Sequence, residues 1–334
     1  MEVKVVKSYS SNKGVASMEL NTSIIMLPKE PMRPRYHDPR VGYFTESYTD
    51  YDKNPQGVDV TRMITRWRLE PKPEDMERYK AGELVEPAKP IIYYIDPATP
   101  SKWIPYLMQG VDGWEPVFRA AGFKNAIMAK LAPTKEQDST WSLEDARYSA
   151  IVYKPSSIPN ASGPHISDPR TGEILESHVN WYHNVMSLLH HWYFIQCSAV
   201  DTAARKMIFD DSLMGQLIRF VSSHEIGHTL GMQHNFAASS AYPVDKLRDK
   251  DFVKQYGHTS SIMDYCRFNY VAQPEDSIPQ QYLFPRIGKY DYWCIEWGYR
   301  LFPEIENPRD ERQLLNDWII EKTKDRYLWF GSGY

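Results

Sequence analysis

Residues 224–234 have the sequence HEIGHTLGMQH, and this stretch decides the fold. In an α-helix, His224 and His228 lie one turn apart on the same face, so both imidazoles can bind one metal ion. Gly231 is expected to end the helix, because glycine tolerates the left-handed conformation found at helix ends. The chain can then turn back and bring His234 to the same ion. The stretch therefore predicts a Zn²⁺ site with three histidine ligands.

Glu225 directly follows the first of these histidines. Its side chain points about 100° further round the helix, away from the ligand set but within reach of a water held by the metal. Three protein ligands leave a fourth position for water or substrate, which distinguishes a catalytic zinc site from a structural one. We therefore expect Glu225 to be the general base of a hydrolytic reaction.

Composition and charge argue against several classes of protein. The chain has 334 residues, of which 42% are hydrophobic and 25% charged, as in globular proteins and unlike disordered ones. With a net charge of −4 and no long basic run, nucleic acid is not an expected partner. No run of about 18 apolar residues occurs, so no transmembrane segment is expected. The 3 cysteines imply no disulfide framework.

Alternating and helical hydrophobic patterns predict an α+β fold. Strands are predicted at 3–6, 18–27, 63–69, 91–95, 126–131 and 149–153, with a strand–turn–strand unit at 165–178. Helices are predicted over 100–121, over 180–206, from Asp210 or Asp211 into the histidine motif and over 287–302. Residues 305–326 are expected to form either a final helix or a solvated face. The buried stripe of the motif helix is expected to be Leu213, Leu217, Ile218 and Val221. The regions 28–55 and 235–258 are expected to be irregular.

The motif, followed by a methionine in a turn at Met263, resembles the metzincin metallopeptidases. Residues 235–239, 261–265, 268–274 and 290–293 are similar to a bacterial, Bacteroidetes-type Met-zincin group. The resemblance implies a zincin catalytic domain, with a twisted mixed sheet and the active-site helix in an upper subdomain up to about residue 231. A lower, mostly irregular subdomain would follow, with a horizontal cleft between the two.

The resemblance also implies a domain organisation and a location. We expect an N-terminal β-rich segment and linker at 1–89, a metzincin-like catalytic domain at 90–303, and a C-terminal helical tail at 304–334. In the similar bacterial group this domain follows a region with an export signal. No signal peptide is found in residues 1–20, so we expect the chain to be the C-terminal portion of an exported protein (periplasmic, cell-surface or secreted) of a Gram-negative bacterium.

Two residues near the motif have roles that the resemblance only suggests. Met263 would form a hydrophobic floor beneath the metal, since a thioether is a poor zinc ligand beside three imidazoles. Tyr265, two residues on, would either ligate zinc or hydrogen-bond the transition state, or else it packs on the turn. Asn235, after the third histidine, differs from the residues of astacins, matrixins, serralysins and reprolysins, so the chain is not placed with any of these.

The expected function is that of a zinc-dependent endopeptidase acting on a protein or peptide substrate. Two alternatives stay open: a zinc hydrolase of glycopeptide or cell-wall peptide, and a weakly active zinc-containing binding subunit. The region 33–51 could line the cleft, and His37 or Asp38 could block the metal. The 165–178 hairpin is either an edge strand that holds the substrate or an ordinary one. The other histidines of the region, His183, His190 and His191, are expected to pack or lie at the surface.

Overall fold

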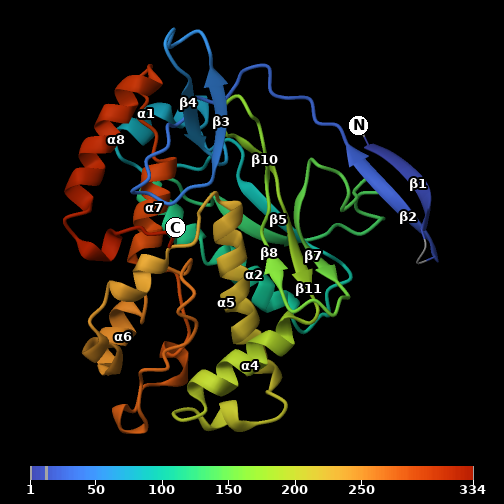
Figure 1. The fold of residues 1–334 in the computed structure, drawn as a ribbon, viewed down its shortest axis with the longest axis vertical. Helices are drawn as coiled ribbons and strands as arrows, with labels where there is room; N and C mark the ends of the chain where they lie inside the picture. Colours follow the sequence, from blue (N-terminus) through green and yellow to red (C-terminus); the bar gives the residue numbers. More distant parts are fainter. Residues whose placement is uncertain (1, 12–13, 334) are drawn as a thin grey trace.

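A five-stranded mixed sheet lies at the centre of the fold, which is α+β as predicted (Figure 1). The computed structural model describes residues 2–11 and 14–333. The strand order is β6-β5-β7-β11-β8, in which the first four are parallel and β8 runs antiparallel to β11 at the edge. The strands are β5 (Ile91–Ile95), β6 (Ile127–Leu131), β7 (Ser149–Lys154), β8 (Ala161–Ser162) and β11 (His178–Tyr182). The strands predicted at 91–95, 126–131 and 149–153 are confirmed.

The helix predicted over 180–206 is wrong in its first part. Residues 178–182 form β11, in which Val179 and Trp181 are fully buried and their neighbours are less so. This alternation is that of a strand, but it is too short to be distinguished from the helical pattern that follows it. Helix α4 (Val185–Cys197) begins only after this strand.

The helix predicted over 100–121 is present but broken. It consists of α2 (Ile104–Asp112), the single turn α3 (Glu115–Phe118) and the 3₁₀ turn η2 (Arg119–Ala121). Pro116 lies in the first turn of α3, and because proline has no N–H it cannot continue the hydrogen bonds of α2. Gly122 ends the unit, as predicted, with a left-handed φ of 90°.

Helix α5 (Asp211–Thr229) carries the first two histidines of the motif and packs closely on α2. Its predicted stripe is buried and consists of Leu213, Leu217, Ile218 and Val221. Gly110 of α2 permits the close approach, because a Cβ at this position would lie 2.3 Å from Ser222 Oγ. The Ser222 hydroxyl also donates a hydrogen bond to the carbonyl of Leu107 at 3.0 Å. The close approach of Gly110 to Ser222 and the hydrogen bond of the Ser222 hydroxyl therefore fix the motif helix against α2.

Three antiparallel hairpins surround the central sheet. They are β1 (Glu2–Ser11) with β2 (Gly14–Ser23), β3 (Thr45–Asp50) with β4 (Asp59–Ile64), and β9 (Ile166–Ser167) with β10 (Ile174–Glu176). The first contains the strands predicted at 3–6 and 18–27, although β2 begins at Gly14 and ends at Ser23, and the third confirms the hairpin predicted at 165–178. The second corrects two expectations, because the region 28–55 contains β3 and the strand predicted at 63–69 ends at Ile64. The sequence of β3, TESYTD, is polar, so hydrophobic alternation does not reveal it.

Residues 71–90, expected to be a linker, pack against the core. They contain the turn η1 (Pro73–Asp75) and the short helix α1 (Met76–Lys80). The Tyr79 hydroxyl donates to the carbonyl of Ala121 at 2.8 Å, and the Val85 N–H donates to the carbonyl of Gly122 at 3.2 Å. The proposed division of the chain at residue 89 stays a prediction.

Short helices and loops make up most of the chain after α5, shown in orange and red in Figure 1. They are η4 (Phe236–Ser240), η5 (Val244–Arg248), α6 (Lys250–Tyr256), η6 (Pro274–Asp276), η7 (Gln280–Tyr282), α7 (Lys289–Tyr299), α8 (Pro308–Lys322) and η8 (Arg326–Leu328). The helix predicted over 287–302 is confirmed, and of the two alternatives for residues 305–326 the helix is the one observed. The region 235–258 is less irregular than expected, since it contains α6. None of the helices in the described residues is long and apolar enough to cross a membrane.

A buried ion pair joins the N-terminal region to α8. Glu311 accepts hydrogen bonds from Arg35 Nη2 at 2.8 Å and from Arg33 Nη2 at 2.7 Å, and Arg35 is fully buried. Burial raises the pKa of Glu311, but the charge and hydrogen bonds of Arg35, together with the charges of Arg33 and Arg66, outweigh this and hold the pKa below its usual value. The carboxylate therefore stabilises the folded chain while it is charged.

Replacing this carboxylate should destabilise the protein strongly. At pH 7 we expect Glu311→Gln to lower the free energy of unfolding by about 3–5 kcal/mol, because it leaves the buried guanidinium of Arg35 without a counter-charge. Since the folded pKa is depressed, the wild-type stabilisation is complete above the unfolded pKa of about 4.3 and is lost as the pH falls through the folded value. Urea denaturation at pH 7 and at pH 3 measures both effects.

The matched control is Glu321→Gln, an exposed glutamate of the same helix, which should change stability little. A difference between Glu311→Gln and wild type that is as large at pH 3 as at pH 7 would contradict the assignment.

Candidate metal centre

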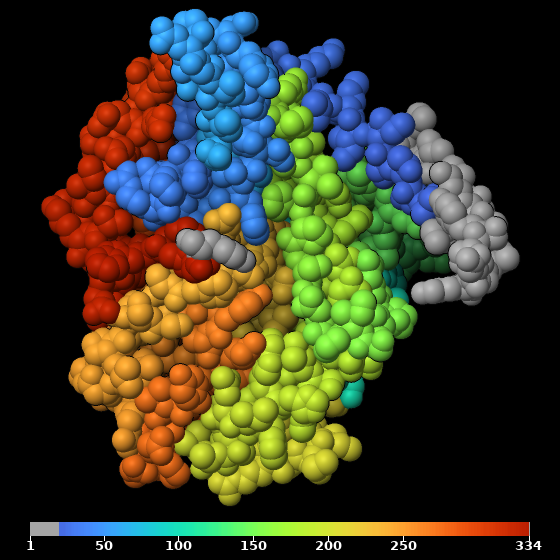
Figure 2. All heavy atoms as spheres, in the orientation of Figure 1, coloured from blue at the N-terminus to red at the C-terminus, as the bar shows by residue number. Residues whose placement is uncertain are grey.

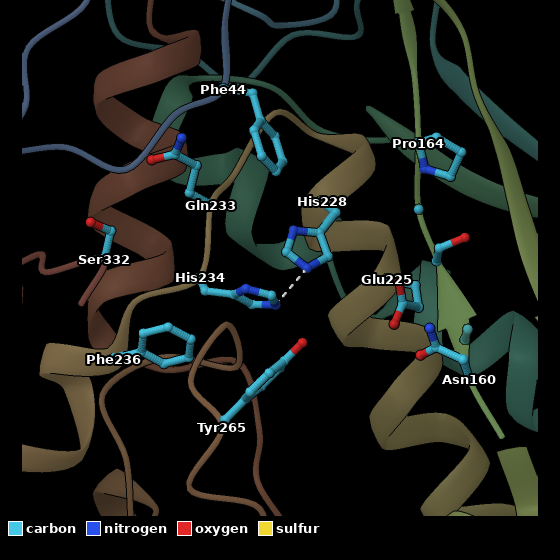
Figure 3. A pocket seen from close by; sticks show the side chains of 13 residues that line it. Phe44, Asn160, Pro164, Glu225, His228, Gln233, His234, Phe236, Tyr265 and Ser332 are labelled. Atoms are coloured by element: carbon cyan, nitrogen blue, oxygen red, sulfur yellow. Dashed lines mark hydrogen bonds between the residues drawn. The ribbon is translucent and has the colours of Figure 1, made fainter. Parts of the chain in front are cut away.

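Three histidines meet where α5 ends. His224 and His228 lie on the last turns of the helix, the helix ends at Thr229, and Gly231 has a left-handed φ of 93°. The chain then turns back, so that His234 Nε2 lies 3.3 Å from His224 Nε2. It also lies 3.0 Å from His228 Nε2, a contact that Figure 3 shows as a dashed line. Two nitrogens that each lie about 2.0–2.1 Å from a tetrahedral ion are about 3.3 Å apart. The spacing therefore fits ligands of one metal ion.

Backbone carbonyls fix the orientation of the two helical histidines. His224 Nδ1 lies 2.8 Å from the carbonyl oxygen of Ile262, and His228 Nδ1 lies 2.9 Å from that of Met232. A carbonyl only accepts hydrogen bonds, so each Nδ1 carries the proton and each Nε2 has a free lone pair. Such second partners of ligand histidines are usual at metal sites.

The three imidazoles are held in the neutral form that binds metals. Burial lowers the pKa of His224 to about 4, and it lowers the pKa of His228 well below its ordinary value and that of His234 as well. Neutral lone pairs that face one another at about 3 Å repel unless a cation lies between them. The donor set and its charge state therefore fit Zn²⁺.

Glu225 lies beside this cluster without joining it. Its carboxylate lines the same cavity as His228 and His234, and Figure 3 shows it separated from them, on the side of Asn160. Burial raises its pKa to about 8, while a hydrogen bond donated by the Gly163 N–H acts in the opposite direction. The arrangement leaves Glu225 free to exchange a proton with a molecule in the cavity.

The cavity beside the histidines has a volume of about 580 Å³ and opens to the surface. Residues from five separate parts of the chain line it, among them Phe44, residues 160–164, Phe236, Tyr265 and Ser332. In Figure 2 it lies in the hollow between the surface coloured green and the surface coloured orange. The cavity is large enough for several residues of an extended peptide.

The edge of the sheet at this cavity is β8 and its neighbours, residues 160–164. The expectation that the 165–178 hairpin supplies the edge strand is therefore wrong, since β9 and β10 form a sheet of their own. Gly163 lets the edge lie directly on α5, because a Cβ there would lie 2.3 Å from the carbonyl oxygen of Glu225. The edge strand is thus held against the residue that we expect to be the base.

Met263 and Tyr265 lie on the lower side of the histidines. Met263 is fully buried, and its sulfur packs on α5 at Gly227, where a Cβ would lie 2.3 Å from Sδ. The Tyr265 ring is 52% exposed, and its centroid lies 4.3 Å from that of His234. Figure 3 shows its hydroxyl turned toward the histidines. The geometry places both residues at the site but leaves their chemical roles as predictions.

The loop that carries His234 is held on one side by the N-terminal region. The Phe44 N–H donates to the carbonyl of Gly231 at 2.7 Å, and the Gln233 N–H donates to the carbonyl of Gly42 at 2.9 Å. The Phe44 ring also contacts His228, with a centroid distance of 5.8 Å. The region 33–51 thus lines the cavity, as expected, through Phe44.

His37 and Asp38 do not line this cavity, and Asp38 forms an ion pair with Arg40 at 2.6 Å. The structure therefore gives no support to the idea that either residue blocks the metal. The remaining histidines also lie outside the cluster. His183 Nδ1 contacts the Tyr153 hydroxyl, and His190 Nε2 lies 3.1 Å from the carbonyl oxygen of Lys206.

The same loop is held on its other side by residues 329–331. The buried Asn235 amide donates to the carbonyl of Trp329 at 2.9 Å and accepts from the Gly331 N–H at 3.0 Å. The Phe236 N–H donates in turn to the carbonyl of Gly331 at 2.8 Å. Asn235, at which this chain differs from astacins, matrixins, serralysins and reprolysins, therefore fixes a distant segment beside the third histidine.

A buried carboxylate supports the first histidine from behind. Asp291 of α7 accepts hydrogen bonds from the Ser261 hydroxyl at 2.6 Å, from the Ile262 N–H at 2.7 Å and from the Gly288 N–H at 2.7 Å. The carbonyl of Ile262 is the group that orients His224. Sequence reasoning gave Asp291 no role of its own, although residues 290–293 are among those that carry the resemblance, because its contact with Ile262 depends on how the chain folds back.

Comparison with known families agrees with this geometry. Residues 206–334 match the family model described as Met-zincin, and residues 1–72 match a model described as a domain of unknown function (DUF5117). Neither a curated protein nor a solved structure matches the chain. The first match supports a metzincin-type domain with a metzincin-like fold, and it points to the general function of a zinc metallopeptidase. The two matched regions meet at the loop that carries His234.

Loss of the Asn235 side-chain amide should make the position of His234, the third expected metal ligand, less well fixed. We expect Asn235→Ala to lower the free energy of unfolding by about 1–3 kcal/mol, because two buried backbone groups lose their partners. We also expect it to weaken zinc binding by about 10-fold, as changes behind metal ligands do. Thermal denaturation and competition with a chelator measure the two effects. Asn235→Asp keeps the acceptor for Gly331 but turns a second acceptor toward the carbonyl of Trp329, so it should also lose stability. Zinc affinity equal to wild type in both variants would contradict the role.

Asp291 should strengthen metal binding through the backbone of Ile262, whose carbonyl orients His224. We expect Asp291→Asn to weaken zinc binding by about 10-fold, because its amide cannot accept all three hydrogen bonds and the carbonyl that orients His224 moves with Ile262. Chelator competition is the measurement, and Asp310→Asn, at an exposed position of α8, is the control. If both variants hold zinc equally well, the link from Asp291 to His224 has no effect on the metal.

Proposed function

We propose that the metzincin-type domain belongs to a zinc-dependent endopeptidase that hydrolyses peptide bonds in a protein or peptide substrate. One observation carries this proposal: three neutral imidazoles converge beside a buried carboxylate at the floor of an open cavity. A structural zinc site would be closed by a fourth protein ligand. Here the side of the cluster that faces the cavity is left for water and substrate.

Each residue of the site has a defined part in this reaction. His224, His228 and His234 would hold Zn²⁺, which when bound makes water acidic and polarises a carbonyl group. Glu225 accepts a proton from the attacking water and gives it to the leaving amine. Tyr265 donates a hydrogen bond to the oxygen that becomes negative as the carbonyl is attacked. Met263 forms the apolar floor of the site, and its turn corresponds to the Met-turn of the similar families.

The substrate would lie in the cavity as an extended strand. Residues 160–164 form the outer edge of the sheet, where backbone groups can pair with a peptide. Phe44 and Phe236 give the opposite wall an aromatic surface. Because Gly163 fixes this edge at Glu225, a peptide paired with residues 160–164 places its backbone next to the base. We also propose, on the resemblance to the bacterial group, that the protein is exported from a Gram-negative cell.

Substitution of the base should separate metal binding from turnover. We expect Glu225→Gln to keep one zinc ion and to lower kcat by about 10²–10⁴-fold, because the amide cannot accept the proton. His234→Ala should lose zinc as well as activity, because two imidazoles remain. Metal analysis and cleavage of casein or of a quenched fluorescent peptide library measure the two properties.

The matched control is Glu321→Gln, an exposed change that should alter neither zinc content nor cleavage. A Glu225→Gln variant that cleaves as fast as wild type would show that the role of the base is wrong. Zinc-loaded wild-type protein that cleaves no peptide in the library would refute the peptidase proposal.

A further inference from the structure

A second, smaller cavity adjoins the metal centre. Its volume is about 60 Å³, and it shares Glu225 and Tyr265 with the main cavity. Its walls come from α4, α5 and the segment after Met263, and they are largely apolar, with Leu188, Trp192 and Phe220 among them. A substrate group that enters this cavity therefore lies beside the residue that exchanges protons in the reaction.

Arg267 places a cation in this apolar wall. Its guanidinium lies over the ring of Trp192, with Cζ 4.0 Å from the ring centroid. No carboxylate of the described residues forms an ion pair with it, and its buried Nε has no hydrogen-bond partner. The other carboxylate of the wall, Asp264, is engaged elsewhere, since it accepts hydrogen bonds from the hydroxyls of Ser239 and Thr259.

The stacked arrangement leaves the donors of Arg267 free. A guanidinium that stacks on an aromatic ring uses its face, while its five N–H donors lie in its plane and point outward. These donors form the fork that binds a carboxylate through two parallel hydrogen bonds. Trp192 thus holds the guanidinium in place without accepting hydrogen bonds from its N–H groups. A cation that is unpaired and partly desolvated favours the binding of an anionic ligand.

The backbone of Arg267 is held in an unusual conformation. Its φ is 56°, in the left-handed region that a side chain such as arginine rarely adopts. Two hydrogen bonds impose this conformation: His258 Nε2 donates to the Arg267 carbonyl at 2.8 Å, and the Phe268 N–H donates to Gln196 Oε1 at 3.1 Å. Strain of this kind persists where the surrounding structure fixes a residue, and it is common at functional sites.

We propose that Arg267 binds a substrate carboxylate in the smaller cavity, so that the enzyme prefers peptides with an acidic group beside the scissile bond. The proposal rests on the peptidase function proposed above. The carboxylate could belong to an Asp or Glu side chain or to the terminus of a short peptide. Both sources offer the same planar anion to the guanidinium, and the experiment below distinguishes them.

Pairs of peptides that differ only in Glu or Gln next to the scissile bond test the preference. With the zinc-loaded full chain we expect kcat/KM to be about 10- to 100-fold higher for the Glu peptide, the usual effect of a hydrogen bond to a charged partner. In Arg267→Gln the Glu-to-Gln ratio should fall to near one, and in Arg267→Glu a Lys peptide should become the better substrate. Arg309→Gln, an exposed change in α8, should keep the wild-type ratio.

Binding measured without turnover separates this proposal from the peptidase function. Fluorescently labelled peptides are titrated into zinc-loaded Glu225→Gln protein, with and without Arg267→Gln, and each peptide is used with a free and with an amidated terminus. A Glu-dependent affinity that disappears in Arg267→Gln supports the side chain as the source, and an affinity that depends on the free terminus supports the terminal carboxylate. Equal affinity for all peptides, or a preference that survives Arg267→Gln, overturns the proposal even if the wild-type protein cleaves no peptide.

Discussion

The structure depends on holding three uncharged imidazoles so that their Nε2 lone pairs face one point. Helix α5 places two of them through its own geometry, since the rings are one turn apart. The third imidazole, that of His234, lies on a loop. A loop needs contacts with other segments to keep a metal ligand in place. That support comes from backbone hydrogen bonds to residues 42–44 on one side and to residues 329–331 on the other.

Segments from the whole length of the chain therefore build the site, although the sequence motif that predicts it is short. Phe44, which belongs to the region matched by the domain of unknown function, contacts His228 and lines the cavity. Asp291 of α7 supports the carbonyl that orients His224. The buried ion pair between Arg35 and Glu311 ties the N-terminal region to α8. The residues expected to perform the chemistry thus rest on contacts between segments far apart in the sequence.

Local patterns predicted the parts of the structure that depend on local physics. The histidine spacing, the left-handed Gly231 and the strand at Ile91–Ile95 follow from helix and strand periodicity. Strand β11 was mistaken for helix, because its two buried residues precede an aromatic helical run. Strand β3 is polar and went unnoticed. The split of the helix at Pro116 could have been predicted, since proline marks it directly.

The contacts around the site could not be predicted in this way. No sequence pattern identifies Arg267 as a binding residue. Its proposed role depends on a guanidinium without an ion-pair partner among the described residues and on a backbone conformation that distant hydrogen bonds impose. Asn235 was noticed only as a departure from other families, and its contact with residues 329–331 depends on how the chain folds back.

The double support of the loop at 231–237 also governs how the metal exchanges. An ion held by His224, His228 and His234 leaves most readily when the third imidazole swings outward, and this requires the hydrogen bonds to Gly42, Phe44, Trp329 and Gly331 to open together. Opening of this kind is a cooperative, local unfolding event and is slow compared with the motion of a free loop. The contacts that hold this loop are therefore expected to lengthen the residence time of the metal as well as to strengthen its binding.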